Sequence, residues 1–153
     1  MAAYFDTGAL VPLYVPEAFS RTVTAYVQKR GDAIPVNVFH LLELETAVAQ
    51  KVFRGEINET RLQAVMERIA LDLAGRRMRL CPVDWVQAIE GARGVGKMCS
   101  ARFGCRTLDL IHVAAAIQWG SDAFVTADDR QVKAACVAGL KVVDIRSPRS
   151  LRP

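Results

Sequence analysis

Short apolar runs that alternate with helical stretches are the feature that most constrains the fold of this chain. The runs are AAYFD, AIPV, RMRLCPV, AFVTADD and KVVDI. Strands that are apolar throughout and joined through helices are typical of a parallel sheet covered on both faces. The sequence therefore predicts an α/β fold, a three-layer α/β/α sandwich around a central, mostly parallel sheet of about four to five short strands.

Capping and stop signals divide the stretches between these runs into helices. The expected helices begin at Thr7, run from Ser20 to Lys29, from Phe39 to the Gly55 stop, from the Asn58 cap to Ala74, over 84–103, from the Thr107 cap to the Gly120 stop, and from Arg130 to Ala138. A chain of 153 residues with 52% apolar residues is the usual size of one domain. We expect a single domain over residues 1–146 and a basic tail over 147–153.

Composition restricts the location and the partners of the protein. No stretch approaches the roughly 20 uncharged apolar residues of a membrane span, and the N-terminus lacks the features of a signal peptide, so a cytoplasmic protein without membrane contact is expected. Cys81, Cys99, Cys105 and Cys136 have neither C-x-x-C nor histidine spacing, which predicts free thiols and no zinc site. The net charge of +4 is compatible with a polyanionic partner.

The stretch GARGVGKMCS, residues 91–100, resembles a phosphate-binding loop of the form G-x-x-x-x-G-K-[ST]. Such a loop follows a strand directly, and Met98 stands where the Mg²⁺-binding hydroxyl is required. On a helical wheel, one face carries Trp85, Ala88, Ile89, Ala92, Gly96, Cys99 and Phe103. The stretch is therefore interpreted as an amphipathic helix that its glycines weaken and can break, at about 1 kcal/mol each.

Acidic residues follow the apolar runs at positions where ligands bind in parallel sheets. Asp6 and Asp128 follow strands, Asp109 lies in the first turn of a helix, and Glu43 lies in the helix after the second strand. Each acid alone fits a helix cap, a dipole partner or a solvated charge. Carboxylates brought together repel unless a hard divalent cation neutralises them, so the joint pattern predicts a Mg²⁺ or Mn²⁺ site that faces phosphate.

Larger segments carry a family resemblance. They are AYFDTGALVPLYVPE, HLLELETAVAQKVFRGEI, CRTLDLIHVAAAI and AFVTADDRQVKAACVAGLKVVDI, and they span nearly the whole chain in the family order. The chain resembles a PIN-domain ribonuclease of the VapC-like toxin type. The resemblance implies an acidic quartet of Asp6, Glu43, Asp109 and Asp128, the last within a T-x-D element. Asp129 is an alternative ligand, because a shift by one position is open.

Two further choices stay open in the sequence. Glu43 and Glu45 lie roughly 200° apart on a helix, and the wheel predicts that Glu45 is the more buried, whereas the resemblance selects Glu43. His40 and His112 each lie three residues from an acid of the quartet, a spacing also found in di-iron helical bundles. Because that class needs further glutamates on facing helices, we expect each histidine to be a packed, hydrogen-bonded group or a neighbour of a metal ligand.

The resemblance implies the function: a Mg²⁺- or Mn²⁺-dependent endoribonuclease that hydrolyses RNA phosphodiester bonds, the toxin of a type II toxin-antitoxin pair. Single-stranded RNA or a structured loop is the expected substrate. By placement, the candidates for holding the RNA backbone are Lys97, Arg102, Arg106 and Arg130, and the candidates for orienting water or a ligand are Thr7 and Thr126. The implied protein partners are a cognate antitoxin, bound along a groove between the early helices, and a second copy in a homodimer.

Two alternatives belong to other classes. A PIN-like fold that binds RNA or protein without cleaving it would keep the fold, although decay to such a module usually removes one of the acids. A Mg²⁺-binding signalling receiver also has acids at strand ends, but it requires a phosphoacceptor aspartate after a central strand. The run RMRLCPV ends without an acid, which disfavours the receiver.

Overall fold

The computed structural model describes residues 2–147, which form two compact units. Unit 1 combines the first six residues with the chain from Pro82 onward, and unit 2 comprises Thr7–Cys81. The tail predicted for 147–153 lies outside the described residues except for Ser147. A single domain over residues 1–146 remains a prediction. Within the described residues, no helix is long and apolar enough to cross a membrane.

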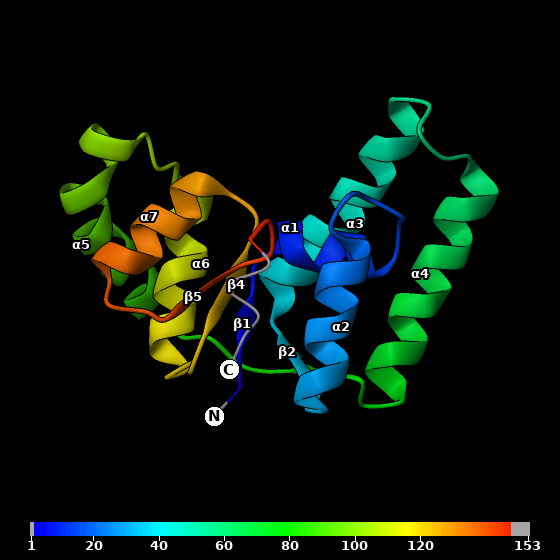
Figure 1. Ribbon diagram of the computed structural model, residues 1–153, viewed down its shortest axis with the longest axis horizontal. Coiled ribbons are helices and arrows are strands. Elements are labelled where there is room, and N and C mark those ends of the chain that lie inside the picture. Colours follow the sequence, from blue (N-terminus) through cyan, green and yellow to red (C-terminus); the bar gives the residue numbers. More distant parts are fainter. Residues whose placement is uncertain (1, 148–153) are drawn as a thin grey trace. The chain divides into compact units, whose positions relative to one another are not determined.

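Unit 1 contains a three-stranded parallel sheet in the order β1-β4-β5. Its elements are β1 (Tyr4–Phe5), α5 (Trp85–Phe103), α6 (Thr107–Gln118), β4 (Phe124–Thr126), α7 (Asp129–Val137) and β5 (Val142–Asp144) (Figure 1). Tyr4 lies opposite Phe124, and Phe124 lies opposite Val142. Because the first strand of the chain pairs with the fourth, the residue that follows β1 shares a sheet edge with the residues that follow β4.

The core of unit 1 is built around α6. Its buried residues are Asp109, Leu110, His112, Val113, Ala114, Ala115 and Ala116, so the helix is apolar on nearly every side. The rings of Tyr4 and Phe124 stack beside it with centroids 5.5 Å apart. Helices α5 and α7 both pack against α6. This arrangement fixes the start of α6, and with it Asp109, against the rest of the unit.

Helix α5 is continuous through its glycines. A Cβ at Gly96 would meet Leu110 Cδ1 at 3.0 Å, so the missing side chain lets α5 approach α6 closely there, whereas a Cβ at Gly91 would make an ordinary contact with Ala114 Cβ at 3.6 Å. Packing of this kind offsets the low helix propensity of glycine. The interpretation of residues 91–100 as helix is confirmed, and the expectation of a break is wrong. The wheel was also inaccurate for Ile89, which is 50% exposed.

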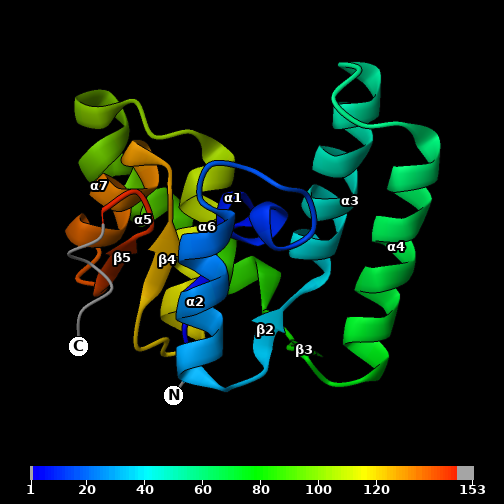
Figure 2. The same ribbon diagram turned by 45° about the vertical axis from the view of Figure 1, so that its right-hand side comes forward.

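Unit 2 contains a two-stranded parallel sheet, β2-β3, and the early helices. Its elements are α1 (Thr7–Leu10), the 3-10 helix η1 (Val11–Leu13), α2 (Ser20–Arg30), β2 (Ile34–Val36), α3 (Val38–Phe53), α4 (Glu59–Ala74) and β3 (Met78–Leu80). Helices α3 and α4 lie side by side in both ribbon views (Figures 1 and 2). The predicted α/β class with parallel strands is confirmed. The strands form two sheets instead of one: β1, β4 and β5 hydrogen-bond in the first, and β2 and β3 hydrogen-bond in the second.

Most of the predicted helix boundaries agree with the structure. The side chain of Asn58 accepts a hydrogen bond from the Arg61 amide at 2.8 Å, and Gly55 and Gly120 end helices with φ of +72° and +59°. Thr107 is not the cap that the sequence predicted. The cap position is Arg106, and its amide donates to the carboxylate of Asp109 in the first turn of the helix at 2.8 Å. All four cysteines are free thiols, as predicted.

Candidate functional site

A buried carboxylate lies at the edge where β1 and β4 of unit 1 end. Asp6 follows β1 and is 1% exposed, and its amide donates to the Val125 carbonyl at 3.0 Å. The Thr126 hydroxyl, at the end of β4, donates to Asp6 Oδ2 at 2.6 Å. Parallel pairing of the two strands therefore sets both the position and the orientation of the Asp6 side chain.

Asp128 forms the N-cap of α7 at the same edge. Its Oδ1 accepts from the Arg130 amide at 2.8 Å, and its own amide donates to Thr126 Oγ1 at 2.9 Å. The Arg130 guanidinium binds Oδ2 at 2.8 Å. Burial opposes ionisation of this carboxyl, but the hydrogen bonds and the charge of Arg130 outweigh it and hold the pKa of Asp128 below its ordinary value. Asp128 is therefore ionised at neutral pH.

Asp109 lies in the first turn of α6 and is 7% exposed. Its Oδ2 accepts from the Arg106 amide at 2.8 Å, and the Arg130 Nε lies 3.7 Å from the same oxygen. The Gln131 side-chain amide donates to the other oxygen, Oδ1, at 3.4 Å. Arg130 thus contacts both Asp109 and Asp128 with one guanidinium.

These contacts join into one group, which we call the acid network. It consists of Asp6, Asp109, Thr126, Asp128, Arg130 and Gln131. Within it, Asp109 and Asp128 share the Arg130 guanidinium, and Asp6 accepts from the Thr126 hydroxyl. The side-chain oxygen of Gln131 is buried and has no hydrogen-bond partner among residues 2–147. Oxygen acceptors of this kind suit a hard cation.

Cys105 lies next to the acid network, but its thiol is not activated as a nucleophile. Its thiol contacts the Arg130 carbonyl at 3.4 Å. Burial, with further contributions from Cys99 and Asp109, raises the pKa of Cys105 to about 11. The thiol is therefore protonated at neutral pH, and a thiolate mechanism is disfavoured.

Glu43 is anchored within unit 2. The Thr7 hydroxyl donates to Glu43 Oε2 at 2.6 Å, and Thr7 directly follows Asp6 in the chain. Glu43 is half-buried and Glu45 is exposed, so the wheel-based expectation that Glu45 is the more buried acid is wrong. The reason is tertiary: α1 packs on α3 and places Thr7 over the Glu43 side of that helix.

The two histidines are packed, hydrogen-bonded groups, as predicted. His40 is fully buried at the start of α3, where its Nδ1 accepts from the Asn37 amide at 3.2 Å and Asn37 Oδ1 accepts from the His40 amide at 3.0 Å. His112 is 2% exposed, and its Nδ1 lies 2.9 Å from the Tyr4 hydroxyl. The His40 ring therefore helps to fix the start of α3, and the His112 ring helps to fix the contact between β1 and α6.

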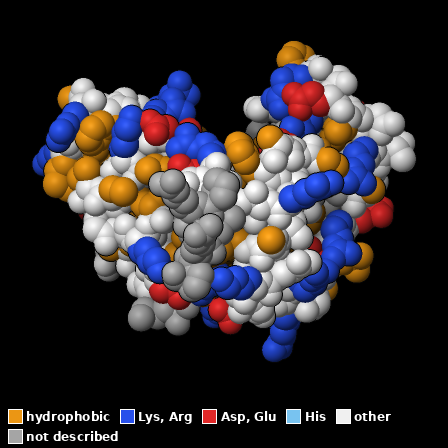
Figure 3. Space-filling model, in the orientation of Figure 1, with side chains coloured by type: hydrophobic (Ala, Val, Ile, Leu, Met, Phe, Trp, Pro, Cys, Tyr) orange, Lys and Arg blue, Asp and Glu red, His pale blue; other side chains and the backbone are white. Residues whose placement is uncertain are grey.

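The candidate RNA-binding cations divide into two kinds. Lys97, Arg102 and Arg106 are exposed along α5 and the start of α6, and lysine and arginine side chains are prominent over this part of the surface in Figure 3. The Arg102 guanidinium lies 4.9 Å from the centroid of the Phe103 ring. Arg130 differs, because its guanidinium is bound to Asp109 and Asp128.

Asp129, the alternative to Asp128, has partners outside the acid network. It is exposed and forms ion pairs with Lys133 and Arg146. Arg146 also binds Asp144 at 2.7 Å, so these acids have their own cations. The contacts of Asp128 with Thr126 and Arg130 make it the better placed of the two neighbouring aspartates.

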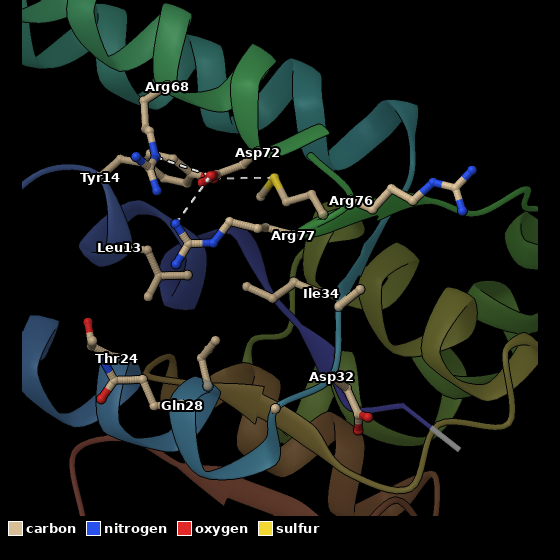
Figure 4. Close-up of a pocket in the computed structure, with 14 residues that line it drawn as sticks. Leu13, Tyr14, Thr24, Gln28, Asp32, Ile34, Arg68, Asp72, Arg76 and Arg77 are labelled. Carbon is tan, nitrogen blue, oxygen red and sulfur yellow. Dashed lines mark hydrogen bonds and ion pairs between the residues drawn. The ribbon is translucent and has the colours of Figure 1, made fainter. Parts of the chain in front are cut away.

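Unit 2 contains a cavity of about 480 Å³ that no sequence pattern indicated (Figure 4). Asp72 from α4 lies in its wall. Its carboxylate accepts from the Tyr14 hydroxyl at 3.0 Å and pairs with Arg68 at 3.1 Å and Arg77 at 3.8 Å. We call these four residues the Asp72 cluster. Burial, and next the charge of Asp72, raise the pKa of Tyr14 well above its ordinary value.

The cavity and the acid network lie at opposite ends of the strands of their own sheets. Ile34 and Met78, the first residues of β2 and β3, line it, so it lies at the amino ends of these strands. Ligands of parallel sheets bind at the carboxyl ends. The sequence missed the Asp72 cluster because Tyr14 and Asp72 are 58 positions apart. It missed Gln131 because an amide in a first helical turn resembles an ordinary surface residue.

The residues of the acid network fit a divalent cation by their chemistry. Carboxylate, hydroxyl and amide oxygens are the donors that Mg²⁺ and Mn²⁺ prefer. Within each unit, the described residues contain no group of three or more His, Cys, Asp or Glu side chains placed to hold a metal ion. In this arrangement Asp109 and Asp128 are engaged with Arg130, which supplies the positive charge.

Comparison with known proteins identifies the family. No curated protein gives a significant match. The chain is similar to a chain in the crystal structure of FitAcB from Neisseria gonorrhoeae, with 18% identity over 95% of this chain and 99% of that one and a TM-score of 0.67. It is also similar to a chain of VapBC-1 from nontypeable Haemophilus influenzae, with 14% identity over 96% and 100% of the two chains and a TM-score of 0.58. At these identities the likeness concerns the fold. Residues 3–136 match the family model described as PIN domain, and the protein therefore belongs to the PIN domain family.

Proposed function

We propose that this protein is a metal-dependent endoribonuclease that hydrolyses RNA phosphodiester bonds, and that it acts in the cytoplasm as the toxin of a toxin-antitoxin pair. PIN domains are generally nucleases and typically use divalent metals. The observation that carries the proposal is the acid network, in which contacts through Thr126 and Arg130 join three carboxylates from separate segments of the chain. Asp6 and Asp109 are buried, and burying ionised carboxylates is costly unless cations pair with them.

The proposed ligands of Mg²⁺ or Mn²⁺ are Asp6, Glu43, Asp109 and Asp128. Contacts within unit 1 support Asp6, Asp109 and Asp128, whereas Glu43 is assigned from the family pattern and from its hydrogen bond with Thr7. Asp129 is less suited, because Lys133 and Arg146 bind it. A bound cation would lower the pKa of a water molecule and offset charge on the phosphoryl group and the leaving oxygen.

The protein's own side chains would position the reacting groups. Thr126 holds Asp6, the Arg106 amide holds Asp109, and Thr7 holds Glu43, so each carboxylate has a fixed neighbour. The threonine hydroxyls can also orient a water molecule. Arg130 can pair either with Asp109 and Asp128 or with an RNA phosphate, and we propose that it exchanges between the two.

The RNA backbone would bind along the exposed cations Lys97, Arg102 and Arg106. Single-stranded RNA or a structured loop is the proposed substrate, since its backbone can bend toward buried carboxylates. The likeness in fold to FitAcB and VapBC-1 supports a cognate antitoxin as partner. A homodimer is proposed with it, from the family resemblance.

Labelled RNA incubated with Mn²⁺ tests the proposed function. Wild type is expected to cleave it, whereas Asp6→Asn and Glu43→Gln are expected to lose activity by about 100-fold or more. Glu45→Gln is the matched control, because Glu45 is an exposed acid on the same helix, and it should keep wild-type activity. Equal RNA loss in wild type and Asp6→Asn would contradict the proposal, and RNA binding without cleavage would support the non-catalytic module.

A further inference from the structure

Gln131 has a buried side-chain oxygen that no donor of the described residues satisfies. The residue lies in the first turn of α7 and is 8% exposed, and within residues 2–147 its Oε1 has no hydrogen-bond partner. Buried polar atoms in proteins are nearly always paired, because an unpaired acceptor loses its water without compensation. An exception at this position indicates a group that completes the site.

Gln131 contacts two of the carboxylates in the acid network, one through its side-chain amide and one through its backbone amide. Its side-chain nitrogen donates to Asp109 Oδ1 at 3.4 Å, and its backbone nitrogen donates to Asp128 Oδ1, also at 3.4 Å. Asp109 Oδ2 is already bound by the Arg106 amide at 2.8 Å. The side chain therefore spans from α7 to the start of α6, and its oxygen belongs to the same planar amide as the nitrogen that contacts Asp109.

Core packing does not require a polar side chain at this position. The other buried residues of α7 are Ala134 and Ala135, so the helix packs through small apolar groups. Carboxylate oxygens accept hydrogen bonds and cannot satisfy a further acceptor. The Gln131 oxygen can therefore be satisfied only by an N–H or O–H donor or by a cation, and amide oxygens are good ligands of hard cations.

We propose that the side-chain oxygen of Gln131 is an additional ligand of the divalent cation bound by Asp6, Asp109 and Asp128. The proposal rests on the proposed function and deepens its metal site. Gln131 adds a neutral oxygen ligand, whereas a further carboxylate in its place would add negative charge to the site. Its nitrogen keeps the hydrogen bond to Asp109, so the same amide holds one ligand and supplies another.

Calorimetric titration of the metal-free full chain with Mn²⁺ tests this role without relying on activity. Gln131→Met removes both the oxygen and the N–H at similar length, and we expect it to weaken Mn²⁺ binding about tenfold. Gln131→Glu removes the N–H donor but keeps an oxygen ligand, and we expect binding at least as tight as in wild type. Circular dichroism checks that each variant is folded.

The two variants separate a ligand from a residue that only orients Asp109. Unchanged Mn²⁺ affinity in Gln131→Met would overturn the proposal, and so would a loss in Gln131→Glu as large as that in Gln131→Met, since an orienting role needs the N–H alone. If Gln131→Met does not fold, Gln131→Glu decides by the same criterion: retained affinity supports the ligand and weakened affinity overturns it.

Asp109→Asn distinguishes failure of this inference from failure of the proposed function. Mn²⁺ binding by wild type that is lost in Asp109→Asn but unaffected in Gln131→Met would leave the metal site in place and overturn the Gln131 ligand alone. Absence of Mn²⁺ binding in wild type, or equal binding in Asp109→Asn, would overturn both.

Discussion

The acid network of unit 1 and the Asp72 cluster of unit 2 use the same residue types with opposite charge balance. In the acid network, two carboxylates, those of Asp109 and Asp128, contact one guanidinium, that of Arg130. In the Asp72 cluster, one carboxylate has two guanidiniums and a tyrosine hydroxyl. Both lie at ends of parallel strands, the first at the carboxyl ends of β1 and β4 and the second at the amino ends of β2 and β3.

The difference separates a chemical role from a structural one. Two carboxylates on one guanidinium lie beside the amide oxygen of Gln131, which has no partner in the part of the chain that the structure describes, and a cation would stabilise such a group. The Asp72 carboxylate, by contrast, is engaged by Tyr14, which directly follows η1, by Arg68 of α4 and by Arg77, which directly precedes β3, and these contacts tie the three elements together. A cavity beside an ion cluster therefore does not by itself indicate the site of chemistry.

The largest expected effect concerns RNA cleavage. Asp109→Asn is expected to lower the cleavage rate by about 100- to 1000-fold, the usual cost of removing one electrostatic group from a catalytic site. Asp72→Asn is the matched control and should leave the rate within about twofold, since the contacts of Asp72 described above are with Tyr14, Arg68 and Arg77 of unit 2. A comparable loss in Asp72→Asn would break the comparison.

The next effect concerns stability, for which Asp72→Asn is expected to be the more damaging of the two variants. Asp72→Asn is expected to lower the free energy of unfolding by about 2 kcal/mol, because its hydrogen bond to Tyr14 and its ion pairs are weakened at a side chain that is 13% exposed. Asp109→Asn should change it by less than about 1 kcal/mol, since relief of repulsion offsets the lost contact with Arg130. Guanidinium unfolding of both variants measures this, and the reverse order would contradict the assigned roles.

Arg130→Gln is expected to have a smaller effect, which raises Mn²⁺ affinity and lowers RNA affinity. Removing the guanidinium frees Asp109 and Asp128, so Mn²⁺ affinity should rise about fivefold, the size of a partly exposed ion pair. RNA affinity should fall, and the slope of its salt dependence should decrease by about one phosphate contact. Calorimetry and RNA binding at several salt concentrations measure both. Arg68→Gln, from the Asp72 cluster, should change neither, and weaker Mn²⁺ binding in Arg130→Gln would exclude the exchange.

The smallest effect is a pH dependence in the Asp72 cluster. The pKa of Tyr14 is raised in the folded state by burial and by Asp72, relative to about 10 in the unfolded chain. Its contribution to stability is therefore complete below pH ~10 and is lost as the pH rises through the folded value. The stability difference between wild type and Tyr14→Phe should be constant from pH 7 to ~9.5 and should shrink above pH ~10. A difference that grows with alkaline pH would contradict this account of Tyr14.

The parts of the fold that local patterns determine could be predicted from the sequence. The apolar runs became parallel strands, and Asn58, Gly55 and Gly120 set helix ends where expected, because capping depends on a few adjacent residues. The sequence also located Asp6 directly after β1 and Asp128 two residues after the end of β4. Their positions at one sheet edge follow from the pairing of β1 with β4.

The features that the sequence could not supply depend on contacts between distant segments. Helix α5 stays continuous because Gly96 meets Leu110 of α6, and Glu43 is more buried than Glu45 because Thr7 of α1 covers it. Neither contact has a periodic signature. The engagement of Arg130 with Asp109, the unpaired oxygen of Gln131 and the whole Asp72 cluster likewise arise only when the segments meet.

Diffraction from crystals of the full chain grown with Mn²⁺, recorded at the manganese absorption edge, tests the central claim most directly. The account predicts an anomalous peak within bonding distance, about 2.0–2.4 Å, of carboxylate oxygens of the acid network, and none at Asp72. A peak at the Asp72 cluster, or Mn²⁺-bound crystals in which the acid network has no peak and Arg130 still holds Asp109 and Asp128, would contradict it.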